Sequence, residues 1–239
     1  MNILVCGAAG HMGQILCDQI EQSEDMTVCA RIGHCNRIEY DGTVDCVIDF
    51  SNHAATGMLL DYCMEKGCPV VIATTGQTEE EKERIRAAAE VIPVFFAANM
   101  SVGIALLAEL AERAARMFPD ADIEIVERHH NRKLDVPSGT ALMLANRIAD
   151  VREGSELVIG RHENGKRRPQ EIGIHSLRLG NEVGTHEIVI SDGRETITLR
   201  HEAENRSLFA GGALAAARFL VGHSAGLYNM QSMLSGDNT

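Results

Sequence analysis

The sequence lacks tryptophan and has few aromatic residues of any kind, which make up 4% of its 239 positions. Proteins that bind single-stranded nucleic acid stack bases on aromatic side chains, so this composition argues against that class. Basic residues are also in deficit, because 22 Lys and Arg stand against 34 Asp and Glu and give a formal charge of −12. A general nucleic-acid binder needs a basic surface, and we therefore expect no nucleic-acid partner.

Long hydrophobic runs and an export signal are missing as well. No apolar stretch approaches the ~20 residues that a helix needs to span a bilayer. The sequence opens directly on Asn2-Ile3-Leu4-Val5-Cys6, which has neither a basic region nor a cleavage site. We expect a cytoplasmic protein with no membrane partner.

Cysteine does not occur after position 68, and no two cysteines have the CxxC spacing of a metal or redox pair. An odd number of cysteines without an export signal is typical of free thiols in a reducing compartment. We interpret all of them as small buried residues. They are Cys6, Cys17, Cys29, Cys35, Cys46, Cys63 and Cys68.

The first hundred residues alternate between short apolar runs and helical patterns. Strands that are apolar on both faces and alternate with helices indicate a parallel sheet covered on both sides. Thr78 is expected to open one helix, with Glu81 completing a capping box. The other expected elements are strands at 3–6, 26–32, 45–50, 69–73 and 94–97, and helices at 12–22 and 54–66.

After Asn99 the pattern changes. A helix is expected at 102–117, a strand at 122–128 and a helix at 140–149. Three strand-like segments then follow without an intervening helix, which predicts a mostly antiparallel sheet, and an apolar helix at 209–221 returns to the first domain. The three segments are 171–179, 186–191 and 195–201. The sequence therefore predicts an α/β domain of 1–101 and 207–239 and an α+β domain of 102–206.

A glycine-rich turn, Gly7-Ala8-Ala9-Gly10-His11-Met12-Gly13, directly follows the first expected strand and opens a helix. Gly7 permits the tight turn, Gly10 lets the backbone approach a pyrophosphate, and Gly13 allows close packing of helix and strand. The positive end of the helix attracts the phosphates. This placement predicts a Rossmann-like dinucleotide-binding domain, and the alternative is a purely structural turn.

The end of the second expected strand bears on which dinucleotide this domain would bind. The second strand has no acidic residue at its end to bind the ribose hydroxyls, whereas Arg31, His34 and Arg37 lie nearby. Arg31 either meets a 2′-phosphate, which would favour NADPH, or is simply solvated. Two loops follow strands at the edge where the nicotinamide half is expected, although they could be ordinary loops. They are Ala73-Thr74-Thr75-Gly76 and Ala97-Ala98-Asn99-Met100-Ser101.

Positive charge is concentrated in one stretch of this acidic protein. His129, His130, Arg132 and Lys133 fall within five positions. Ser138 is then expected to cap a helix, with the amides of Gly139 and Thr140 at the helix start forming a cradle for a carboxylate. The combination suits a small di-anion, and the alternative is a solvated charged face.

A metal site is the other interpretation of the paired histidines. Neighbouring residues of an extended segment point to opposite faces, so His129 and His130 could not easily share one ion. No third ligand has suitable spacing. We expect no metal.

The pattern Glu-x-His-His-x-x-Lys-x-Asp-x-Pro-Ser-Gly-Thr-Ala over 127–141 resembles the signature of the 4-hydroxy-tetrahydrodipicolinate reductase family, which acts in the diaminopimelate–lysine pathway. The glycine-rich turn and the loops at 73–76 and 96–101 are similar to that family in order and spacing. The resemblance covers nearly the whole chain and implies reduction of a small cyclic dicarboxylate with NADH or NADPH.

The resemblance also implies roles for the two domains and for single residues. Residues 7–12, 73–75 and 97–100 match the family's cofactor contacts, and the domain of 102–206 binds the substrate and forms a homotetramer through its sheet. His129 matches the catalytic acid/base and Lys133 a second proton donor. The substrate-binding positions are His130, Ser138, Gly139 and Thr140, and we expect Arg206 to help bind a carboxylate.

Two other functions remain open from the sequence. One is a related two-domain NAD(P)-dependent dehydrogenase acting on an amino acid or a semialdehyde, which has no need of the His-His-Lys cluster. The other is a non-catalytic cofactor-sensing protein, which would tolerate substitution of both His129 and Lys133.

Overall fold

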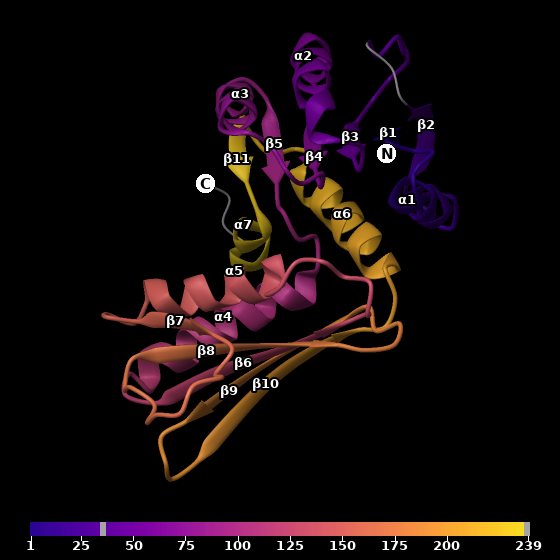
Figure 1. Ribbon diagram of the computed structural model, residues 1–239. Coiled ribbons are helices and arrows are strands. Elements are labelled where there is room, and N and C mark those ends of the chain that lie inside the picture. Colours follow the sequence, from indigo (N-terminus) through magenta and orange to yellow (C-terminus); the bar gives the residue numbers. More distant parts are fainter. Residues whose placement is uncertain (34–36, 237–239) are drawn as a thin grey trace. The chain divides into compact units, whose positions relative to one another are not determined.

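The computed structural model describes residues 1–33 and 37–236, so that His34 and Cys35 lie outside the described residues. The chain divides into two compact units, which are described separately (Figure 1). Unit 1 is Met1–Val102 with Arg206–Thr239, and unit 2 is Gly103–Asn205. These bounds differ by one residue at each junction from those expected, and the binding roles of the two units stay predictions.

Unit 1 contains a sheet of six parallel strands in the order β11-β5-β4-β3-β1-β2. This confirms the predicted parallel, Rossmann-like sheet. The three-residue strand β11, which contains a glycine, was not predicted. The strands are β1 (Asn2–Cys6), β2 (Thr27–Ile32), β3 (Cys46–Asp49), β4 (Val70–Ile72), β5 (Pro93–Phe96) and β11 (Gly226–Tyr228).

The helices of unit 1 begin close to where the sequence predicts them, except for a short helix at 230–235 that was not predicted. Thr78 and Glu81 form the expected capping box. The apolar helix α6 packs against β3, β4 and β5, as predicted for the returning segment. Gly212 lets the backbone of α6 lie directly against the backbone at Met100, because a Cβ on Gly212 would lie 1.7 Å from the Met100 carbonyl oxygen. The helices are α1 (His11–Glu21), η1 (His53–Ala55), α2 (Thr56–Lys66), α3 (Glu79–Ala89), α6 (Ser207–Leu220) and α7 (Met230–Ser235).

The core of unit 1 explains its apolar strands. Every residue of β3 is buried, and so are four of the five residues of β1, because helices cover both faces of a parallel sheet. Six cysteines lie in the described part of the chain; all six are free thiols and five of them are buried. This confirms the interpretation as small core residues for these five, whereas Cys29 is half-buried and Cys35 lies outside the described residues.

Unit 2 contains a five-stranded sheet in the order β10-β9-β6-β8-β7. The expected mostly antiparallel sheet is wrong in this detail: β9 pairs antiparallel with β6 and β10, but β8 pairs parallel with β6 and β7. The helix after β6 carries the chain back, so β7 runs in the direction of β6, and the segment at 160–170 returns the chain again, so that β8 runs in this direction too. The elements are α4 (Val102–Met117), β6 (Asp122–His129), α5 (Gly139–Asp150), β7 (Glu156–Ile159), β8 (Glu171–Arg178), β9 (Gly184–Ser191) and β10 (Thr196–Ala203).

Both helices of unit 2 lie on the same side of its sheet (Figure 1). Side chains of a strand alternate between faces, and Ile123 and Ile125 of β6 point into the core formed with α4 and α5. Glu127 and His129 continue this inward-facing row towards the end of β6, and both are buried. The core face of the strand therefore changes from apolar to ionisable within one unbroken element.

Among the helices in the described part of the chain, none combines the length and the apolar character needed to cross a bilayer.

Candidate active site

Two positions in and just after the turn that follows β1 have no room for a residue larger than glycine. Gly7 has a positive φ of 77°, and a Cβ there would lie 2.5 Å from the Phe50 carbonyl oxygen. A Cβ on Gly13 would lie 2.1 Å from the Gly7 carbonyl oxygen, because the first turn of α1 packs directly on the loop backbone. This is the contact predicted for the dinucleotide-binding turn.

Hydrogen bonds hold this turn and leave the helix end for a ligand. The amides of Gly7 and Ala8 donate to the Ile32 carbonyl over 2.9 and 3.2 Å, and the Gly10 amide donates to Gly7 over 2.9 Å. Within the described residues no side chain caps α1 at Gly10. The amides of the first turn, at His11 and Met12, therefore point to the place where an anion would bind.

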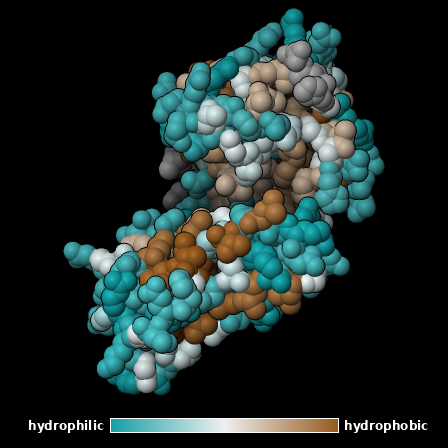
Figure 2. Space-filling model, in the orientation of Figure 1, coloured by the Kyte–Doolittle hydropathy of each residue, from teal (hydrophilic) through white to brown (hydrophobic). Residues whose placement is uncertain are grey.

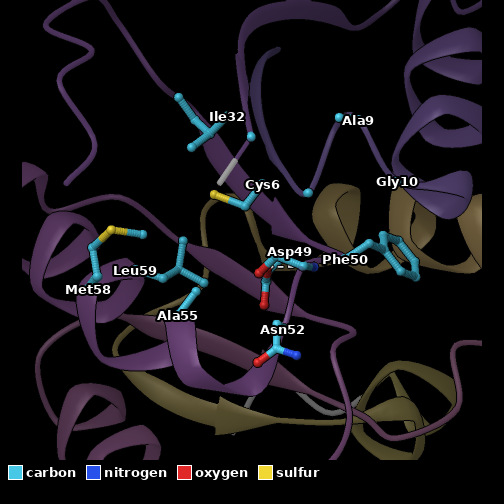
Figure 3. Close-up of a pocket in the computed structure, with 13 residues that line it drawn as sticks. Cys6, Ala9, Gly10, Ile32, Asp49, Phe50, Asn52, Ala55, Met58 and Leu59 are labelled. Carbon is cyan, nitrogen blue, oxygen red and sulfur yellow. Dashed lines mark hydrogen bonds between the residues drawn. The ribbon is translucent and has the colours of Figure 1, made fainter. Parts of the chain in front are cut away.

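A cavity of about 240 Å³ opens beside this turn (Figure 3). It lies where β1 and β3, neighbours in the sheet, end at the same edge. Its size and its mixed lining suit part of a nucleotide. The lining residues are Cys6, Gly7, Ala9, Gly10, Ile32, Gly33, Asp49, Phe50, Ser51, Asn52, Ala55, Met58 and Leu59.

Asp49, at the centre of Figure 3, is a functional candidate that we did not identify from the sequence. Its side chain is buried, and burial raises its pKa although Ser51 donates to it from both backbone and hydroxyl. Its Oδ2 has no hydrogen-bond partner among the described residues. Its position as the last residue of an apolar strand was the available signal.

The two other predicted cofactor loops follow β4 and β5 and do not line this cavity. Thr74 Oγ1 donates to the Asp49 carbonyl over 3.4 Å, which ties the loop at 73–75 to the end of β3. Asn99 Oδ1 accepts from the Ser101 amide over 2.9 Å. Both loops lie at the carboxyl edge of the parallel sheet, and their contacts with a cofactor stay predictions.

Arg31 forms an ion pair with Glu21 of α1. Its side chain is 51% exposed, so it is neither free in solvent nor fixed in a buried site. The 2′-phosphate role predicted for Arg31 would require this pair to open, and His34 lies outside the described residues.

In unit 2, His129 is held by a buried carboxylate on its own strand. Glu127 is fully buried, and His129 Nδ1 lies 2.6 Å from its Oε2. The two residues are two positions apart on β6 and therefore share a face. Burial acts to raise the pKa of Glu127, but hydrogen bonds from His129 and Arg178 outweigh it and hold that pKa well below its usual range.

Glu127 also binds an arginine and the start of α5. Arg178 of β8 donates from both terminal nitrogens, over 2.8 Å to Oε2 and 2.7 Å to Oε1. The Ser138 amide donates to Oε1 over 3.2 Å. Ser138 caps α5 as predicted, since its hydroxyl accepts from the Ala141 amide. Gly139 and Thr140 are the first two residues of this helix.

His186 of β9 is a third buried group of the cluster. Its ring lies 5.3 Å from the ring of His129 in an edge-to-face arrangement, and its Nε2 is 3.2 Å from the Ser138 hydroxyl. Burial, and then the nearby His129, lower the pKa of His186 to about 3. His186 is therefore neutral near pH 7 and contributes no charge to the site.

Lys133 and Asp135 form a pair in the loop after β6. The Lys133 ammonium lies 2.9 Å from Asp135 Oδ1. Lys133, and more weakly the Gly139 backbone, lower the pKa of Asp135. Lys133, the predicted second proton donor, and Gly139, a predicted substrate-binding residue, thus already face a carboxylate of the protein.

Other predicted site residues take different positions. His130 directly follows β6, and its carbonyl accepts from the Lys133 amide over 3.2 Å. Arg132 is exposed and donates to Asn181. Arg206 is the N-cap residue of α6 and belongs to unit 1. The substrate contacts of His130 and Arg206 stay predictions. Over residues 1–33 and 37–236 the structure shows no group of three or more His, Cys, Asp or Glu that could hold a metal ion.

Glu127, Arg178 and His186 are members of this cluster that the sequence analysis did not identify. For Glu127 a signal existed, because residues two apart on an alternating strand share a face. For the other two no local signal exists, since strand pairing brings Arg178 opposite His129 and His186 opposite Glu127.

The arrangement can bind an anion at each of two helix starts and can deliver a proton from a buried, oriented imidazole. Two family models match the chain: "Dihydrodipicolinate reductase, N-terminus" over residues 1–100 and "Dihydrodipicolinate reductase, C-terminus" over residues 103–234.

Proteins named 4-hydroxy-tetrahydrodipicolinate reductase are similar along nearly the full chain. The one from Caldanaerobacter subterraneus subsp. tengcongensis is 40% identical over 246 residues, with 98% of each chain covered. The one from Clostridium novyi is 37% identical over 250 residues, with 99% of each covered. The one from Rickettsia bellii is 40% identical over 234 residues, with 96% of this chain and 93% of that one covered.

Solved structures also resemble this chain. A dipicolinate-bound dihydrodipicolinate reductase from Paenisporosarcina sp. TG-14 matches with a TM-score of 0.80 and 26% identity, over 96% of this chain and 97% of that one. A DAP dehydrogenase from C. glutamicum in complex with DAP matches with a TM-score of 0.58 and 11% identity, over 99% and 96%, which is a likeness of fold alone. The chain belongs to the dihydrodipicolinate reductase family.

Proposed function

We propose that the protein reduces 4-hydroxy-tetrahydrodipicolinate to tetrahydrodipicolinate, using NADH or NADPH, in diaminopimelate and lysine biosynthesis. Relatives about 40% identical along the chain carry the name of this activity. The observation that carries the proposal is the buried Glu127–His129 pair, which the Ser138 amide joins to the start of α5. An oriented imidazole beside a helix N-terminus suits protonation of a ring that bears carboxylates.

The residues of unit 1 fit a nicotinamide dinucleotide. The positions of Gly7 and Gly13 leave no room for a Cβ, and Asp49, whose Oδ2 has no hydrogen-bond partner in the described part of the chain, lies at the adjacent cavity. The first turn of α1 would bind the pyrophosphate, and the loops at 73–75 and 97–100 would contact the nicotinamide half. When bound, the cofactor supplies the hydride.

The substrate is a six-membered ring with a C=N bond and two carboxylates. Loss of its hydroxyl as water gives a conjugated imine. We assign one carboxylate to the start of α5, at Gly139 and Thr140, where the helix dipole favours a negative charge. To bind there, this carboxylate must compete with Asp135 for Lys133. Anchoring the ring in this way supplies orientation.

His129 supplies the proton. Addition of hydride to the ring builds negative charge on the neighbouring carbon and nitrogen. The Nε2–H bond of the His129 imidazolium breaks, its electron pair stays on Nε2, and the proton forms the new bond on the ring. Lys133 stabilises the charge or donates a proton. General-acid help of this kind is worth about 10²–10⁴ in rate.

We also propose a homotetramer formed through the sheet of unit 2. The helices cover one side of this sheet, and Figure 2 shows hydrophobic residues at several places on the surface of unit 2. Leu177 of β8 and Leu179, which follows this strand, are exposed large hydrophobic residues. Light scattering on the purified protein tests this, and a monomer at micromolar concentration contradicts it.

A coupled assay tests the activity. Pyruvate and aspartate semialdehyde are condensed enzymatically to supply the substrate, and oxidation of NADH and of NADPH is followed in parallel. We expect turnover with at least one cofactor. Cofactor binding measured by calorimetry without turnover would instead indicate a sensor, and turnover only with an amino acid or a semialdehyde would indicate the related dehydrogenase.

A further inference from the structure

We propose that Glu127 is the positioning residue of this site: it fixes which nitrogen of His129 carries the proton, and it holds the His129 ring and the start of α5 in one arrangement. The role in turnover rests on the proposed function, whereas the state of the ring can be measured without substrate.

The contacts of one buried carboxylate carry this inference. Oε2 lies 2.6 Å from His129 Nδ1 and accepts from Arg178 over 2.8 Å. Oε1 accepts from Arg178 over 2.7 Å and from the Ser138 amide over 3.2 Å. Glu127 therefore joins β6, β8 and the N-terminus of α5, and the distance from the imidazole to the helix start depends on it.

The ionised state of Glu127 determines the tautomer of His129. A carboxylate only accepts hydrogen bonds, so the neutral ring must carry its proton on Nδ1. Nε2 is then unprotonated in the neutral ring and is the nitrogen that gains and loses the catalytic proton. Nε2 faces the backbone of β9, because a Cβ on Gly184 would lie 3.0 Å from it.

Arg178 makes the burial of this carboxylate possible. An unpaired buried carboxylate would be strongly destabilising, and the two-pronged pair with Arg178 neutralises it. Arg178 also donates to the Asp135 carbonyl over 2.7 Å, which anchors the loop that carries Lys133. The pair thus supports both groups to which we assign proton donation.

Ionisable groups face His129 from its own strand, from both neighbouring strands and from the following loop. Glu127 lies beside it on β6, Arg178 opposite it on β8, and neutral His186 on β9. Lys133 and Asp135 lie in the following loop as a pair. The first turn of α5 has no acidic residue. Glu127 is therefore the negative charge that directly contacts the imidazole among these groups.

The first experiment is ¹⁵N NMR of the full-length protein with labelled histidine, using His129→Gln to assign the signal. At a pH where the ring is neutral, we expect His129 to carry its proton on Nδ1. A neutral ring protonated on Nε2 overturns the proposal. This measurement needs no substrate and no variant of Glu127.

The second experiment compares Glu127→Gln with the matched control Glu124→Gln, which removes a carboxylate from the other face of β6. We expect Glu127→Gln to lower kcat about 100-fold and to abolish the preference for Nδ1 protonation. The alkaline limb of its pH–rate profile should move to lower pH, because the imidazolium loses its carboxylate. Glu124→Gln should leave tautomer and profile unchanged.

Two outcomes separate this inference from its premise. An Nδ1-protonated ring in a protein without reductase activity would sink the proposed function and leave the positioning role of Glu127 standing. Normal turnover with an unshifted profile in Glu127→Gln would sink the positioning role alone. If Glu127→Gln does not fold because Arg178 is left unpaired, the double variant Glu127→Gln/Arg178→Gln removes both charges and is held to the same readouts.

Discussion

The two units build their proposed functional sites in opposite ways. In unit 1 the site is made of backbone, and the absence of side chains at Gly7 and Gly13 creates it. In unit 2 the cluster is made of side chains from three strands and a loop, with Glu127 at its centre. A backbone site depends on local spacing, whereas a side-chain cluster depends on strand pairing. The backbone site should therefore lose its function when an atom is added, and the side-chain cluster should lose its function when an atom is removed.

Removing the His129 imidazole should have the largest effect. In His129→Ala the proton donor is lost, and we expect kcat to fall by about 10²–10⁴. The Kd for NADPH should not change, since the predicted cofactor contacts lie in unit 1. Stopped-flow kinetics and calorimetry measure the two quantities. His175→Ala on β8 is the control, and near-normal kcat in His129→Ala would refute the assignment.

A methyl group added at Gly13 should disrupt the proposed cofactor site of unit 1. A Cβ would lie 2.1 Å from the Gly7 carbonyl oxygen, so the backbone must move, which costs about 1–3 kcal/mol of stability. We expect weaker NADPH binding and a lower Tm, with dipicolinate binding unchanged. Gly211→Ala, whose Cβ would have 3.8 Å of room, is the control. Unchanged NADPH affinity in Gly13→Ala would argue against the glycine turn as the cofactor site.

Gly184→Ala tests whether the unit 2 cluster also depends on close packing. Its Cβ would lie 3.0 Å from His129 Nε2 and would displace the ring. Because small misplacements of a catalytic group are costly, we expect kcat to fall about 10- to 100-fold without loss of NADPH affinity. Steady-state kinetics with calorimetry check this. Wild-type kcat would mean that the position of Nε2 does not matter.

Asp135→Asn, in contrast to the preceding variants, should strengthen ligand binding in unit 2. The Asp135 carboxylate forms an ion pair with Lys133, a residue that we assign to the substrate. This half-exposed pair is worth about 0.5–1 kcal/mol. Removing the charge of Asp135 should tighten dipicolinate binding about two- to fivefold in a calorimetric titration. Weaker binding would indicate that Asp135 orients Lys133 rather than competing with the ligand.

The remaining effect is on stability and depends on pH. The pKa of His186 is about 3 in the folded protein against an ordinary value of 6.5, so the unfolded chain binds the extra proton between these values. Stability should fall as pH drops below 6.5 and level off below about 3. His186→Gln should flatten the dependence of the urea midpoint on pH between 7 and 4. An equally steep dependence in the variant would contradict the neutral state of His186.

The same contrast explains what could be predicted from the sequence. The turn at 7–13, the capping box at Thr78 and the Ser138 cap each depend on residues within a few positions, and the structure contains them. The parallel pairing of β8 with β6 depends on where the chain returns after α5, and the half-exposed strand β7 has only four residues. The hydrophobic periodicity of the sequence indicates neither the parallel pairing of β8 nor the presence of β7.

For the site, the difference is one of distance along the chain. Glu127 and His129 share a face because they are two apart on one strand, which is a local rule. Arg178 and His186 join them only through the pairing of β6 with β8 and β9. The resemblance at 127–141 therefore indicates the proposed donor of the proton, and the structure is needed to identify the residue that we propose positions it.

The most direct test of the account is a crystal structure with pyridine-2,6-dicarboxylate bound. The account predicts one carboxylate of the ring within hydrogen-bond distance of the Gly139 and Thr140 amides, with the ring beside His129 Nε2. A ring bound elsewhere, with both amides and the imidazole untouched, would contradict it.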